Sequence, residues 1–135
     1  MRLALALLLL AGCVESKPDL ALGQKLYAQH CGACHGMKLE GQPDWQRRMG
    51  NGRLPAPPHD ESGHTWHHPD EVLFGITKHG LVPPYAPPGY PSDMPAFAGT
   101  LSDSEIRAVL AYIASHWKTP EVLRAREELI RNSRK

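Results

Sequence analysis

Cys31-Gly32-Ala33-Cys34-His35 places two cysteines three positions apart, with a histidine directly after the second. This C-x-x-C-H spacing is typical of covalent haem attachment, in which both thiols bond one porphyrin edge and the histidine reaches the iron. Paired cysteines also occur in zinc sites, thiol redox pairs and disulfides. The compartment decides between these interpretations, because a cytosolic setting favours zinc, whereas an exported setting favours a disulfide or haem attachment.

The N-terminal residues predict export. Arg2 precedes an apolar run over Leu3–Ala11, and nine residues at about 1.5 Å each cannot cross a hydrocarbon core of about 30 Å. The run therefore predicts a secretory signal over residues 1–12. The stretch from Leu10 to Cys13 resembles the lipobox of bacterial lipoproteins, which implies cleavage before Cys13 and lipidation of that residue.

On this interpretation residues 13–18 are a short tether, and the mature protein is anchored on the periplasmic side of a bacterial membrane. By resemblance to enteric lipoproteins, Val14 directly after the cysteine favours a location in the outer membrane. The alternative is a soluble secreted protein in which Cys13 lies within the signal. Of the three cysteines, lipid then uses Cys13 and haem uses Cys31 and Cys34, so no free thiol is left over.

Size and charge fit one small domain without a nucleic-acid partner. The chain has 135 residues, 15 basic and 14 acidic, and removal of the signal takes away Arg2, leaving 14 basic and 14 acidic side chains. A net charge near zero lacks the basic face that nucleic acids require. A single C-x-x-C-H motif predicts one covalent haem c.

Helical patterns alternate with proline-rich loops, and strand patterns are absent, so we expect an all-α fold. The first helix is predicted over about residues 19–32 with Asp19 as N-cap. A second begins with Pro69 at its first position and ends at Gly80. A third follows the capping box that starts at Ser102 and extends to Trp117. Residues 119–135 predict an amphipathic tail helix, and residues 44–49 are compatible with a short helix.

Three methionines compete for the second axial position on the iron. Met37 is only two residues from His35 and cannot reach the opposite face of the ring. Met49 lies among Arg47, Arg48, Gly50 and Asn51, which look like a solvated turn. Met94 is 59 residues after His35, in a loop where Pro95 fixes the backbone beside it. Met94 is therefore the predicted ligand.

With these features in hand, the sequence resembles the class I c-type cytochromes over roughly residues 19–118. The elements follow that family's order: Gly23 and Tyr27 in a first helix, the C-x-x-C-H motif, Met94-Pro95-Ala96-Phe97-Ala98-Gly99, and a closing helix with Val109-Leu110-Ala111-Tyr112-Ile113. The resemblance implies three main helices around one haem, with His35 and Met94 as axial ligands. It also implies that Gly23 faces Val109 and Tyr112, and that Trp66 approaches a haem propionate.

Two features do not follow the family's pattern directly. Many members use a proline carbonyl to accept the hydrogen bond of the proximal histidine, and here Pro43 and Pro55 both compete for that role. In addition, five histidines crowd into 21 residues: His59, His64, His67, His68 and His79. They could bind a second metal such as copper or zinc, one could replace Met94, or they could act as a helix cap, line the loop or meet the haem propionates.

The predicted function is single-electron transfer between a periplasmic redox donor and acceptor by a membrane-tethered carrier, without catalysis of its own. Methionine opposite histidine leaves no open coordination position on the iron. The alternatives are an electron-transfer subunit of a dehydrogenase or oxidase complex, a haem enzyme in which Met94 is labile, and a metal-handling protein that uses the histidine-rich loop.

Overall fold

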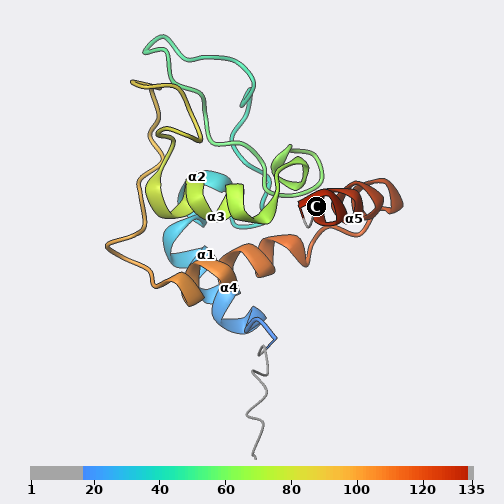
Figure 1. Ribbon diagram of the computed structural model, residues 1–135. Helices are drawn as coiled ribbons and strands as arrows, with labels where there is room; N and C mark the ends of the chain where they lie inside the picture. The colour runs from blue at the N-terminus through green and yellow to red at the C-terminus, as the bar shows by residue number, and fades with distance from the viewer. Residues whose placement is uncertain (1–16, 134–135) are drawn as a thin grey trace, which may run out of the picture.

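The computed structural model describes residues 17–133, which form five α-helices and one 3₁₀ helix (Figure 1). The α-helices are α1 (Leu20–His30), α2 (Gly32–His35), α3 (Asp70–His79), α4 (Asp103–Ala114) and α5 (Pro120–Ser133), and the 3₁₀ helix η1 spans Thr65–His67. Residues 17–133 contain no strand, which confirms the all-α prediction for this part. The predicted signal, tether and Cys13 anchor lie almost wholly outside it. No helix within residues 17–133 is long and apolar enough to cross a membrane.

The helix ends follow the predicted capping chemistry. The Asp19 side chain accepts from the Leu22 N–H at 3.0 Å at the start of α1, and Ser102 and Glu105 form a reciprocal capping box at the start of α4. Gly80 closes α3 at φ 81°, a conformation that glycine adopts without strain. Pro69 occupies the N-cap of α3, one position earlier than predicted.

Helices α1 and α4 cross closely at Gly23, and both contribute buried residues to the core. A Cβ atom at Gly23 would lie 2.1 Å from the Ala108 carbonyl oxygen and 2.9 Å from Tyr112 Cβ. The prediction that Gly23 faces Tyr112 is confirmed, but its other neighbour is Ala108 and not Val109. Val109 is buried in the core cluster instead, at 1 % exposure.

One further prediction about helix extent was wrong, and the short helix that residues 44–49 allowed does not form. Helix α4 ends at Ala114, so Trp117 lies after the helix, where its indole N–H donates to the His59 carbonyl oxygen at 2.9 Å. Residues 44–49 form turns, because the Asp44 backbone is left-handed at φ 53° and this interrupts a helix.

Two long loops gather at the end of the molecule away from the start of α1, drawn in teal and in yellow in Figure 1. The first covers residues 42–56 and the second precedes Met94. Arg53 pairs with Asp93 at 2.5 Å, and the Arg48 guanidinium lies 5.5 Å from the centre of the Tyr90 ring. These contacts join segments that are far apart in the sequence, and they restrain the loop that contains Met94.

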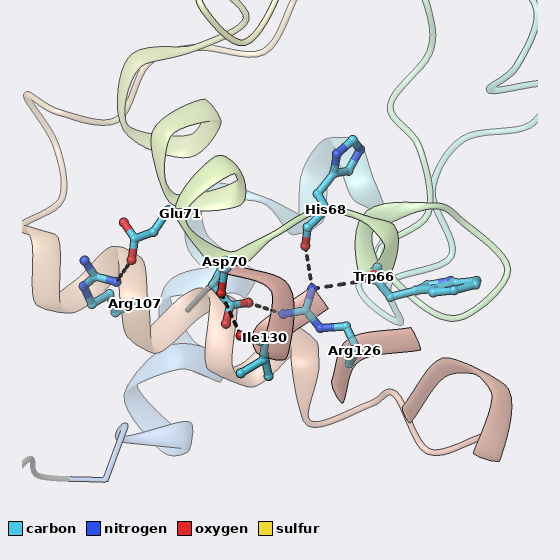
Figure 2. Close-up of polar contacts among 8 residues, drawn as sticks. Trp66, His68, Asp70, Glu71, Arg107, Arg126 and Ile130 are labelled. Carbon is cyan, nitrogen blue, oxygen red and sulfur yellow. Dashed lines mark hydrogen bonds and ion pairs between the residues drawn. The ribbon is translucent and has the colours of Figure 1, made fainter. Parts of the chain in front are cut away.

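Helix α5 is held to the segment before α3 by one buried arginine (Figure 2). Arg126 donates to the Trp66 carbonyl oxygen at 3.4 Å and the His68 carbonyl oxygen at 2.5 Å, and it pairs with the Asp70 carboxylate. Its guanidinium also lies 5.2 Å from the centre of the Trp117 ring. Arg126 thus satisfies two backbone carbonyl groups, and together with the buried Val122 it holds the tail helix against the domain.

Replacement of Arg126 by alanine is expected to lower the free energy of unfolding by about 2 kcal/mol, because two carbonyl groups lose a charged donor. Chemical denaturation of the haem-loaded protein measures this loss. Arg124→Ala is the matched control, since Arg124 is exposed on the same helix and its ion pair, with Glu121, is also exposed. Equal stability of the two variants would contradict this role of Arg126.

Candidate haem site

The attachment motif lies where α1 gives way to the single turn α2. Cys31 is the C-cap of α1, and its carbonyl oxygen accepts from the backbone N–H groups of Cys34 (3.1 Å) and His35 (2.9 Å). Both thiols are free; Cys34 is exposed and Cys31 is half-buried. Burial, aided by the neighbouring Cys34, raises the pKa of Cys31 to about 11. One tight turn therefore presents both thiols and the histidine together.

His35 is oriented by a backbone carbonyl. Its Nδ1 lies 2.8 Å from the Pro57 carbonyl oxygen, and since a carbonyl can only accept, Nδ1 carries the proton. The lone pair is then on Nε2, the arrangement that a metal-binding histidine needs. The ring is buried, and this burial lowers the pKa of His35 even though the hydrogen bond to Pro57 opposes the shift. The neutral imidazole, which binds metals, is thus favoured.

The carbonyl that holds His35 belongs to neither of the two predicted prolines. Pro43 and Pro55 were the candidates, and Pro57 makes the contact. At Gly41 φ is 69°, and a Cβ atom there would lie 2.4 Å from the Pro58 nitrogen. Glycine is therefore required for the backbone at residue 41 to lie this close to the backbone at Pro58. A backbone acceptor has no side-chain signature, and the run of prolines from residue 55 onward was the only signal available in the sequence.

Met94 differs from the other two described methionines in its surroundings. Met37 and Met49 are 61 % and 41 % exposed, whereas Met94 is half-buried and packs against the core. Its segment is tied down on both sides, by the Arg53–Asp93 ion pair and by the Phe97 N–H, which donates to the Thr77 carbonyl oxygen at 3.1 Å.

Phe97 also links this segment to the attachment motif. Its ring meets the His30 ring edge-on, with centroids 6.2 Å apart. His30 immediately precedes Cys31, and Phe97 is three residues after Met94. The fold therefore brings the methionine loop beside the end of α1, as a second axial ligand requires.

The five histidines of the predicted cluster disperse into different surroundings. His59 stacks on His35, His64 stacks on Trp45 and meets His68 edge-on, His67 contacts Trp66, and His79 is exposed at the end of α3. Within residues 17–133, no three or more His, Cys, Asp or Glu side chains are grouped so as to hold a metal ion. No side chain of His67 or His68 caps α3.

The indole N–H of Trp66 forms a hydrogen bond with a residue close to it in the sequence. The group donates to the Glu61 carbonyl oxygen at 3.3 Å, and the ring lies against His67 with centroids 3.6 Å apart. The approach of Trp66 to a haem propionate stays a prediction.

These residues fit a covalent haem. Two accessible thiols share one helical turn with a buried imidazole whose Nε2 is available, and a half-buried thioether lies in a secured loop nearby. Thiols, imidazole and thioether are the donors that hold haem c and ligate its iron. Sequence reasoning proposed these four side chains, whose roles stay predictions, and it did not point to Pro57 or to the stacked ring of His59.

Comparison with known proteins supports the same assignment. A family model described as Cytochrome c matches residues 20–117, which covers α1 to α4 together with the attachment motif and Met94. No curated protein and no solved structure matches the chain. Helix α5 lies beyond the matched region. The chain therefore belongs to the cytochrome c family, whose members carry covalently bound haem c and transfer electrons.

Proposed function

We propose that this protein is a membrane-tethered monohaem cytochrome c that passes single electrons between periplasmic redox partners, with His35 and Met94 as the axial ligands of its iron. The observation that carries the proposal is the contact between His35 Nδ1 and the Pro57 carbonyl oxygen at 2.8 Å. This contact leaves the lone pair of His35 on Nε2, where it could bind iron. His35 directly follows the second of the two cysteines that would hold the porphyrin.

The side chains around the site suit electron transfer better than catalysis. When bound, the haem supplies a one-electron couple at its iron. His35 is fixed by Pro57, and Met94 lies in a loop closed by Arg53 and Asp93. If both side chains bound the iron, no coordination position would be left for a substrate. The exposed Cys34 marks the face where the haem edge would be closest to a docking partner.

The proposed tether predicts the location of the protein in the cell. Cys13→Ser removes the thiol that would carry the diacylglycerol, so most of the protein is expected to move from the membrane fraction to the soluble periplasmic fraction. Immunoblots of the two fractions measure the change, and the haem spectrum should stay the same. Ser16→Ala is the matched control and should remain with the membrane. Retention in the membrane of Cys13→Ser protein from which the signal has been removed would contradict a lipid anchor at this residue.

The same site could serve an electron-transfer subunit of a larger oxidoreductase complex. Size-exclusion chromatography of the wild-type protein in mild detergent distinguishes the two arrangements. A free carrier elutes at the size of one or a few chains, and a subunit elutes with its partners.

A further inference from the structure

We propose that His59 is a positioning residue for the haem: its ring fixes the rotation of the His35 imidazole and thereby sets part of the reduction potential. The two rings are stacked, with centroids 3.8 Å apart and planes inclined by 18°. The inference rests on His35 as the proximal ligand of the proposed function. In this proposal His59 does not bind the iron itself, and its ring contacts His35, which does.

The His59 ring is held in place by its own backbone. The His59 N–H donates to the Leu39 carbonyl oxygen at 2.8 Å, and the His59 carbonyl oxygen accepts from the Trp117 indole at 2.9 Å. The ring also meets Tyr27 nearly edge-on, with centroids 5.9 Å apart. The imidazole thus contacts two aromatic rings, Tyr27 and His35, and these contacts restrict its freedom to turn.

The hydrogen bond from His35 to Pro57 does not fix the ring plane alone. A carbonyl oxygen accepts over a broad range of directions, so this contact restrains the position of Nδ1 more than the tilt of the ring. A flat ring packed against the face of His35 opposes rotation about the bond that Nε2 would make to iron. Pro57 and His59 together therefore define both the direction and the plane of the ligand.

A histidine at this position is not explained by stability. Among residues 17–133 its buried Nδ1 has no hydrogen-bond partner, and leaving a buried polar atom unpaired is unfavourable. Leucine would fill a similar volume without that cost. The electron-rich face of the His59 ring lies against a ligand that becomes more positive when the iron is oxidised. This attraction resembles that between a cation and an aromatic face and favours the oxidised state.

The test compares haem-loaded wild type with His59→Leu, which lacks a planar ring, and with His59→Phe, which keeps one. The potential is read from the equilibrium with a reference couple. The ring plane is read from the proton NMR shifts of the haem methyl groups in the oxidised protein, which depend on the orientation of the axial imidazole. His64→Leu is the matched control, because His64 stacks on Trp45 with centroids 5.2 Å apart.

We expect His59→Leu to shift the equilibrium about threefold toward the reduced form, roughly 30 mV at about 59 mV per tenfold for one electron. Its methyl shifts should differ from those of the wild type, while His59→Phe and His64→Leu keep the wild-type pattern. If the leucine variant does not accumulate, His59→Met, which also lacks a planar ring, takes its place.

Unchanged potential and methyl shifts in the leucine or methionine variant would overturn the inference and leave His59 as a packing residue. A wild-type protein without an iron–His35 bond would overturn the proposed function, and this inference with it. The wild-type spectrum alone therefore separates the two failures.

Discussion

Met94→Ala is expected to abolish the sulfur-to-iron charge-transfer band of the oxidised protein and to open one coordination position on the iron. Met94 is half-buried against the core and is the methionine best placed to meet a haem attached at Cys31 and Cys34. Loss of the thioether should let carbon monoxide or cyanide bind rapidly. Because axial ligands set haem potentials over a range of about 0.8 V, we expect the potential to fall by on the order of 0.1–0.3 V.

The control for this prediction is Met49→Ala, which removes an exposed methionine from the loop of residues 42–56. Its spectrum and potential should match those of the wild type. If the band survives in Met94→Ala, Met94 is not the ligand. If the wild type shows no such band and has the spectrum of two histidine ligands, one of the nearby histidines ligates the iron in place of Met94.

Gly23→Ala is expected to destabilise the protein by about 3 kcal/mol, because it forces extra volume into a closely packed helix crossing. The new Cβ would lie 2.1 Å from the Ala108 carbonyl oxygen, which is backbone and cannot swing aside. At an ordinary helical site the same change would stabilise the helix by about 1 kcal/mol. The sign of the effect therefore distinguishes a crossing point from a plain helix position.

Guanidinium denaturation of the haem-loaded protein, followed by circular dichroism, measures this effect. Gln24→Ala is the matched control, because Gln24 is exposed on the same helix and its replacement should change stability by less than about 0.5 kcal/mol. A Gly23→Ala protein as stable as the wild type would show that α1 and α4 do not approach as closely as described.

Local chemistry explains why the helices could be predicted from the sequence. The Asp19 cap, the Ser102–Glu105 capping box and the Gly80 stop all depend on residues within a few positions of each helix end. The attachment motif is equally local, because two thiols and a histidine within five residues define it. The tail helix from Pro120 was visible for the same reason.

Contacts between distant segments could not be predicted in this way. Pro57 reaches His35 through its backbone carbonyl, across a loop closed by the pairing of Gln42 and Ala56. Arg126 looked like one charged residue of an amphipathic helix, yet it is buried because unpaired carbonyl groups face it from another segment. The pattern of residue types in the sequence does not indicate which backbone carbonyl groups lack a hydrogen-bond donor in the fold.

The dense run of histidines was the least informative pattern. Spacing along the chain left a metal site open as one alternative, but the loop and η1 direct these rings toward different neighbours. A metal site requires convergence in space, and proximity in sequence does not provide it outside regular structure. Within this run, His59 is the histidine that stacks on His35, and only the fold reveals this contact.

The most direct test of the central claim is the intact mass of the protein purified from membranes of a host that matures c-type cytochromes. We predict a chain that begins at Cys13, carries acyl groups and holds one haem, with no thiol left to react with an alkylating reagent after denaturation. A mass that includes haem but no lipid would contradict the anchor alone. A chain without haem, whose Cys31 and Cys34 are both alkylated, would contradict the account as a whole.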